Sequence, residues 1–274
     1  MDSVYQRAYE ALMHVKVEQK AQAVFALLED WREQRLSLEP TEVVAIVQPG
    51  RPDRPELVSP KLLKARGLGS HEGRASLLHS IAHIEFNAVN LALDAVYRFQ
   101  QMPADFIDDW LKVASEEAYH FQLLREQLAG YGYDYGDFPA HNGLWETTHE
   151  TAFDVLARMA LVPRTLEARG LDVTPDMMKK LRAVGETRAV EILHILLRDE
   201  VGHVAVGSKW FNWLCQQRGL DRFDTFKMLI DTHLKGGLKP PFNLEARRQA
   251  GFSEVELAWL MSLSANASNK ALSN

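Results

Sequence analysis

Two Glu-x-x-His motifs, each within an apolar stripe of a predicted helix, constrain the possible folds of this chain more than any other feature. The first, in SEEAYHFQLL, pairs Glu117 with His120, and the second, in RDEVGHVAV, pairs Glu200 with His203. Residues three or four apart share one face of a helix. Burying an isolated charge on an apolar face is costly unless something compensates it. One such pair could be a surface pair, but two of them predict a shared ligand inside the fold.

Two further acids extend the pattern. Glu85 lies on an apolar stripe of HSIAHIEFNAVNLALDA, and Glu167 ends a similar stripe. The spacing from Glu85 to Glu117 is 32 residues, and that from Glu167 to Glu200 is 33, as in a duplicated helical hairpin. One Glu from each of two helices, with Glu-x-x-His from each of two others, is the ligand set of ferritin-like di-iron and di-manganese proteins.

Charge and chemistry favour a pair of metal ions in such a site. Four carboxylates would repel one another inside a bundle, and two divalent cations would neutralise them. Carboxylate oxygen with imidazole nitrogen suits iron, or manganese in its place. The predicted metal ligands are Glu85, Glu117, His120, Glu167, Glu200 and His203.

Two acids directly precede proposed ligands. Asp199 comes before Glu200, and Glu116 comes before Glu117. Either acid could accept the outer N–H of a ligating histidine and orient its ring. The alternative interpretation, a solvated acid, stays open at both positions.

Apolar periodicity predicts an all-α protein. Long helices are expected over 2–34, 71–101, 103–129, 145–169 and 187–217. Gly170 is expected to end the third helix of the central four, and Pro175 to open a short separate helical piece. The stretch 42–48 is either a short strand or an extended arm. Ser70 could cap the helix that begins at residue 71. Ser253 and Glu256 could form the capping box of a terminal helix.

These elements predict one domain, 1–274, with three parts. Residues 1–70 supply an N-terminal helix and an ordered arm, 71–218 a ferritin-like four-helix bundle, and 219–274 a C-terminal helical extension. The single cysteine, Cys215, rules out an intramolecular disulfide and fits a reducing compartment. The segment MDSVYQRAYE lacks the basic start and apolar run typical of a signal peptide, and no apolar run approaches the roughly 20 residues that span a bilayer. We therefore expect a cytoplasmic protein without a membrane partner.

The net charge of the chain indicates which kinds of partner it can bind. The formal net charge of −6 argues against a nucleic-acid partner. The sequence is compatible with a homodimer and leaves the oligomeric state open.

The central segment resembles the ferritin-like superfamily, including bacterioferritin-type and rubrerythrin-type proteins and the di-iron tRNA hydroxylases. It is most similar to a bacterial ferritin-like family named as a domain of unknown function. The segments that carry this similarity are RPELVSPKLLKARGLGSHEGRASLLHSIAHIE, NLALDAVYRF, FDVLARMALVPRTLEARGLDVTP, LRDEVGHVAVG and PPFNLEAR. The resemblance implies a ferritin-like fold and a metal centre with the six residues above as ligands. It implies no established reaction.

Three functions fit these observations. The leading hypothesis is an oxidoreductase whose two iron ions react with O2 and oxidise or hydroxylate an unidentified substrate, with an electron donor also unidentified. The second is an iron-handling or peroxide-scavenging protein. The long terminal extensions argue against a ferritin-type cage, and the absence of Cys-x-x-Cys removes the rubredoxin module of rubrerythrins. The third is a binding module that a metal stabilises.

Overall fold

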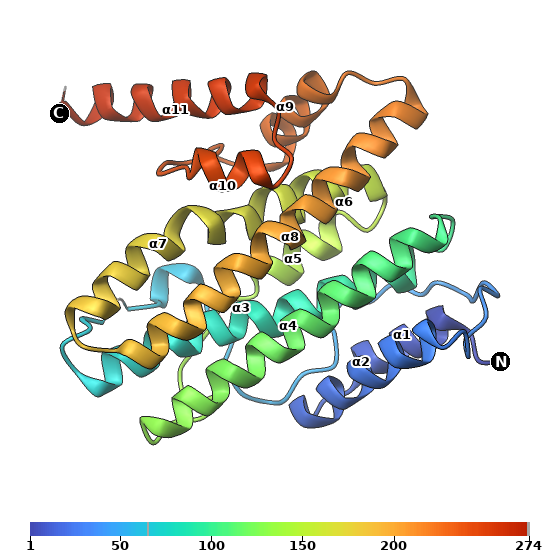
Figure 1. Cartoon of the computed structure of the whole chain (residues 1–274), viewed down its shortest axis with the longest axis horizontal. Helices are drawn as coiled ribbons and strands as arrows, with labels where there is room; N and C mark the ends of the chain where they lie inside the picture. The colour runs from blue at the N-terminus through green and yellow to red at the C-terminus, as the bar shows by residue number, and fades with distance from the viewer. Residues whose placement is uncertain (65, 273–274) are drawn as a thin grey trace. The chain divides into compact units, whose positions relative to one another are not determined.

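The computed structural model describes residues 1–64 and 66–272, and its regular structure is helical (Figure 1). Within these ranges the only β features are two isolated bridges, Ser3 with Ser37 and Leu57 with Ala140. The all-α prediction is confirmed. The chain forms two compact units, Met1–Glu150 with Ala183–Ile192, and Thr151–Arg182 with Leu193–Asn274. The organisation as a single domain stays a prediction.

The N-terminal region of the first unit holds two helices where one helix over 2–34 was predicted. The chain breaks between α1 (Val4–Met13) and α2 (Val17–Arg32). At this break the backbone N–H of Gly50 and the side-chain amine of Lys20 both donate to the carbonyl of Leu12. These donors satisfy a carbonyl that a continuing helix would otherwise have used. Lys20 follows in the next helix, but Gly50 comes from a distant part of the chain, which helical periodicity could not reveal.

The helices α3 (His71–Arg98) and α4 (Ala104–Gly130) form the centre of the first unit, and α1 lies against α3 while α2 lies against α4 (Figure 1). Ser70 caps α3 as predicted, because its Oγ accepts the N–H of Gly73 at 3.0 Å. The helix α5 (Gly143–Glu150) also packs on α3, and η1 (Pro60–Leu62) is a short 3-10 turn.

Residues 42–48 form an extended arm and no strand. Side chains of the first unit hold this arm through its backbone. The Tyr97 hydroxyl accepts the N–H of Val44 at 2.8 Å and donates to the carbonyl of Glu42 at 3.1 Å. The indole of Trp145 donates to the carbonyl of Val47 at 2.9 Å. Backbone groups that would pair in a sheet are therefore bound to side chains instead.

A lysine is buried in the first unit. Lys20 is 2% exposed and donates to the carbonyl of Leu12 at 2.5 Å and to Oδ1 of Asn90 at 2.6 Å. Its amine also lies 5.4 Å from the centre of the Phe86 ring. Burial disfavours the ammonium form and lowers the pKa of Lys20 to about 7.

This lysine should make stability rise with pH. Between pH 7 and the ordinary lysine pKa, the unfolded chain holds a proton that the folded chain has released, so a higher pH favours folding. The free energy of unfolding should gain up to about 1.4 kcal/mol per pH unit from this group. Urea unfolding of the wild type and of Lys20→Met between about pH 7.5 and pH 9.5 measures it. Parallel pH curves for the two proteins would contradict the expectation.

The second unit contains a helical segment that differs from the prediction over 145–185. After a turn at residues 151–154, the chain runs through α6 (Val155–Leu161), the π-helical segment η2 (Val162–Glu167) and α7 (Ala168–Ala183). Gly170 therefore does not end a helix, and Pro175 lies inside one. Pro175 cannot donate to the carbonyl of Leu171. The side-chain amide of Asn243 donates to it instead, at 3.2 Å.

The remaining helices complete the chain. The long helix α8 (Thr187–Arg218), expected over 187–217, contributes residues 187–192 to the first unit and its remainder to the second. It is followed by α9 (Arg222–His233), α10 (Leu244–Gln249) and α11 (Glu254–Leu272). The predicted capping box is confirmed, because the N–H of Ser253 donates to Glu256 at 2.8 Å and the N–H of Glu256 donates to Ser253 Oγ at 3.4 Å.

The segment η2 approaches α8 so closely that only glycine fits at the contact. A Cβ built on Gly207 would lie 2.5 Å from both Cβ and Cγ of Pro163. A proline ring cannot turn away as a flexible side chain would. The backbone of η2 is therefore held against the α8 surface four residues before Glu167.

Substituting two glycines of α8 should give effects of opposite sign. Gly207→Ala should destabilise the protein by about 1–3 kcal/mol, because the added methyl group overlaps the Pro163 ring. Gly202→Ala should stabilise it by about 0.5–1 kcal/mol, because a Cβ there has no neighbour within 4 Å and alanine favours the helix. Urea unfolding of both variants provides the measurement. Equal shifts at the two sites would show that the close approach does not exist.

Candidate metal centre

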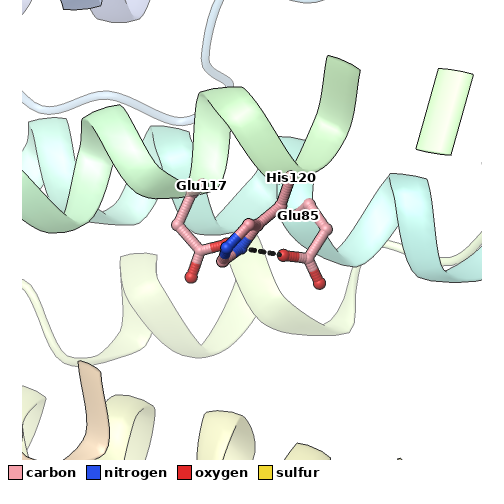
Figure 2. Close-up of side chains that lie close together, drawn as sticks. All are labelled: Glu85, Glu117 and His120. Atoms are coloured by element: carbon pink, nitrogen blue, oxygen red, sulfur yellow. Dashed lines mark hydrogen bonds and ion pairs between the residues drawn. The ribbon is translucent and has the colours of Figure 1, made fainter. Parts of the chain in front are cut away.

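Three of the predicted ligands meet inside the first unit. Glu85 comes from α3, and Glu117 and His120 come from α4 (Figure 2). His120 Nδ1 lies 3.1 Å from Glu85 Oε2 and 3.3 Å from Glu117 Oε2. The three residues offer ligand atoms that all lie within 4.8 Å of one another, and each residue is buried. This spacing fits a set of donors around one metal ion.

The packing of α3 on α4 explains why these side chains meet. Glu117 and His120 are one helical turn apart and project from the same face of α4. The residues next to two of the ligands also pack together, because the Phe86 and Phe121 rings have centroids 5.6 Å apart. This aromatic contact fixes the register of α3 against α4. The register in turn places Glu85 opposite His120.

The buried cluster has strongly perturbed protonation. Burial raises the pKa of Glu85 well above its ordinary value, and the neighbouring charge of Glu117 raises it further. Burial lowers the pKa of His120, but hydrogen bonds and charge from Glu117 and Glu85 outweigh burial and raise that pKa to about 11. Without a cation the cluster therefore holds protons at neutral pH. A metal ion must displace them, so its affinity should increase with pH.

The second unit holds a pair with the same local geometry. Both residues lie on α8, where His203 Nδ1 is 3.3 Å from Glu200 Oε2. His203 is 1% exposed. The distance between His120 Nδ1 and Glu117 Oε2 is the same, so the two Glu-x-x-His motifs are structurally alike. Both therefore place a carboxylate beside an imidazole one helical turn away.

Glu167 is buried in the second unit and is the last residue of η2. Its place on a helical stripe was predicted from regular α-helical spacing, which η2 interrupts. π-Helical turns occur mostly as single wide turns and often at functional sites. The next turn approaches α8 closely, because a Cβ on Gly170 would lie 3.6 Å from Glu200 Cγ. The structure thus places the segment that carries Glu167 beside the segment that carries Glu200.

The two acids proposed to orient the histidines have other contacts. Asp199 accepts from Nε of Arg198 at 2.8 Å, and Glu116 lies 3.7 Å from the amine of Lys112. Their action on ligating histidines stays a prediction. So does the combination of all six ligands in one centre, since Glu85, Glu117 and His120 belong to the first unit and the others to the second.

Two other histidines of α3, His79 and His83, make hydrogen bonds. The His83 ring contacts the Tyr135 hydroxyl at 2.9 Å and the His141 carbonyl at 3.0 Å. His79 Nε2 accepts the N–H of Gly136 at 2.9 Å. Burial lowers the pKa of each histidine to about 4, so both rings are neutral at pH 7.

The sequence interpretation missed two groups of buried charges. One is Lys20, which lies on the apolar stripe of α2, and a lysine in such a position was a usable signal. The other is Arg164 in η2, which is 0% exposed and donates to Glu256 at 2.6 Å. Its partner lies 92 residues further along the chain, so no local pattern could reveal the pair.

Fold and site define the described part of the chain as an all-helical protein with a buried Glu–Glu–His cluster that could hold a metal ion. No described helix combines the length and apolar character needed to cross a membrane. The chain belongs to the family described as "Protein of unknown function (DUF455)", whose profile matches residues 13–258. It is 48% identical over 216 residues to an uncharacterized protein of Haemophilus influenzae, covering 76% of this chain and 75% of the relative. No solved structure matches the chain.

Proposed function

We propose that the protein binds two iron ions, or two manganese ions in their place, and uses them with O2 to oxidise or hydroxylate an organic substrate. The ligands are Glu85, Glu117 and His120 from one unit, and Glu167, Glu200 and His203 from the other. The observation that carries the proposal is the buried cluster of Glu85, Glu117 and His120. Two carboxylates and an imidazole form a donor set that suits these metals.

Electrostatics supports a cation in this cluster. Glu85 and Glu117 are both buried. Burial raises the pKa of Glu85, and the neighbouring charge of Glu117 raises it further. A divalent ion would relieve the repulsion and make both carboxylates useful as ligands. The second unit repeats the carboxylate–imidazole pair, and the similar spacing of the two halves, 32 and 33 residues, favours two ions that share one bundle.

Each part of the chain has a role in this proposal. When bound, the metal ions supply the redox chemistry that O2 reduction requires. The carboxylates hold the ions and balance their charge, and the apolar surroundings keep water away from them. Six protein ligands leave coordination positions on two ions for O2 or water. An external donor must supply the electrons, and the substrate must reach the site from solvent.

Loading the protein with ferrous iron tests the proposal. After anaerobic loading and removal of free iron, we expect two ions per chain by elemental analysis. Exposure to O2 should consume the gas and produce ferric absorption in the near ultraviolet. Protein that takes up no metal would refute the proposal. Iron far in excess of two ions would favour iron handling. Bound metal that raises the melting temperature without O2 consumption would favour a metal-stabilised binding module.

A further inference from the structure

We propose that Arg247 positions Glu167 for metal binding, so that the C-terminal helices contribute to the metal centre without supplying a ligand. This inference rests on the proposed function, because it takes Glu167 as a ligand. Arg247 lies on α10, 80 residues after Glu167, and is 1% exposed. Every residue in the argument belongs to the second unit.

Regular helical hydrogen bonding alone does not fix the segment that carries Glu167. Glu167 is the last residue of η2, a wide π-helical turn. Pro163 lies four residues before it, and Pro175 lies eight residues after it. Neither proline has an N–H, so each removes a backbone hydrogen bond from this helical run. The position of the Glu167 carboxylate therefore depends on contacts with neighbouring helices.

One side of this segment lies against α8, through close approaches at both of its ends. These approaches set residues 163–170 beside residues 200–207, which run in the opposite direction. Glu167 is four residues after the start of the first stretch, and His203 is four residues before the end of the second. The two proposed ligands therefore lie at corresponding levels of the paired segments.

Arg247 cross-links the helical turn that follows Glu167. Its Nε donates to Asp172 Oδ1 at 3.0 Å, and its Nη2 donates to Asp172 Oδ2 at 2.7 Å. The same Nη2 donates to the carbonyl of Ala168 at 3.4 Å. Ala168 directly follows Glu167 and is one helical turn before Asp172. The planar guanidinium thus binds the backbone beside Glu167 and a carboxylate one turn later at the same time.

A second buried arginine holds the segment on the other side of the proposed ligand. Arg164 lies in η2, and its Nε donates to Ser208 Oγ of α8 at 3.2 Å. Its Nη2 donates to Glu256 of α11 at 2.6 Å. The Phe252 ring centre lies 4.6 Å from the guanidinium carbon of Arg164 and 5.0 Å from that of Arg247. Residue 167 is therefore held from both sides, and Arg247 can be varied without changing η2 itself.

Equilibrium dialysis with Mn²⁺ tests whether Arg247 acts through Glu167. Arg247→Met should weaken Mn²⁺ binding about 10–100-fold, as expected when a residue that orients a ligand is lost. Glu167→Gln should weaken it at least as much. The combined variant should bind Mn²⁺ no more weakly than Glu167→Gln alone, because a positioning residue has no effect once its ligand is gone. Arg247→Lys keeps the charge but loses the planar fork, so it should recover only part of the affinity.

Leu181→Ala is the matched control for destabilisation. Leu181 is 0% exposed on α7, 14 residues after Glu167, so this variant creates a cavity in the same helix without changing either arginine. It should bind Mn²⁺ as the wild type does. Equal weakening by Leu181→Ala and Arg247→Met would overturn the inference. Effects of Arg247→Met and Glu167→Gln that simply add in the combined variant would overturn it too. If Arg247→Met does not fold, Arg247→Lys supports the same comparisons.

Hydrogen exchange of the metal-free protein tests the positioning without any metal. The amides of residues 165–168 should exchange faster in Arg247→Met than in the wild type or in Leu181→Ala. Unchanged exchange there would overturn the inference even for a protein that binds two ions. A wild type that takes up no Mn²⁺ would refute the proposed function together with this inference. Mn²⁺ uptake that Arg247→Met leaves unchanged would overturn this inference alone.

Discussion

Glu117→Gln should abolish most of the stabilisation that ferrous or manganous ions give this protein. The glutamine keeps the shape of the side chain but removes one of two carboxylates from the buried cluster. Loss of an orienting neighbour alone costs metal sites about 10–100-fold in affinity, and loss of a ligand should cost at least as much. For an ion at 1,000 times its Kd, the wild type gains about 4 kcal/mol, and a 100-fold loss of affinity removes about 2.7 kcal/mol of that gain.

Thermal unfolding with and without added metal, together with elemental analysis, measures this effect. Glu126→Gln is the control, because Glu126 is exposed on the same helix. It should bind metal and respond to it as the wild type does. Retention of the full metal-dependent shift by Glu117→Gln would exclude Glu117 as a ligand, and with it the proposed centre.

Removing Glu256 should destabilise the protein by about 3–5 kcal/mol. Glu256 neutralises Arg164, whose guanidinium carbon lies 4.4–4.6 Å from the centres of three phenylalanine rings. Burial lowers the pKa of Arg164, and the charge of Glu256 opposes that shift. Glu256→Ala would leave a buried cation without its partner and would also remove the capping box of α11.

Urea unfolding of Glu256→Ala against Glu254→Ala provides the measurement. Glu254 pairs with Arg248 on the surface, with its side chain 75% exposed, so its loss should cost far less stability than the loss of Glu256. Arg164→Met combined with Glu256→Leu should recover much of the loss, because no buried charge then remains. Equal destabilisation by the two single alanine variants would show that the buried pair stabilises the protein no more than the surface pair does.

The sequence predicted spacing along each helix better than it predicted contacts between helices. A period of 3.6 residues placed Glu117 beside His120 and Glu200 beside His203, and both pairs have a distance of 3.3 Å. The contact of Glu85 with His120 required α3 to pack on α4, which the repeated spacing suggested. Glu167 is different, because regular helical counting fails across η2.

The fold shows the same division between local and long-range causes. Ser70 and the Ser253–Glu256 capping box act within one turn, and both were predicted from the sequence. The break after α1 depends on Gly50, and the continuation of α7 through Pro175 depends on Asn243. Those donors come from distant segments. Pro175 therefore misled the prediction, because a side chain from another part of the chain replaced the missing hydrogen bond.

The wide turn at η2 affects how relatives of this protein should be aligned. A π-helical turn accommodates about one residue more than an α-helical turn. A homologue with a regular helix here would lack one residue between positions 162 and 167, yet could present its carboxylate at the same point. A single-residue gap before Glu167 would then record an altered backbone winding and not the loss of the acid, so a search for this residue across genomes should permit that gap.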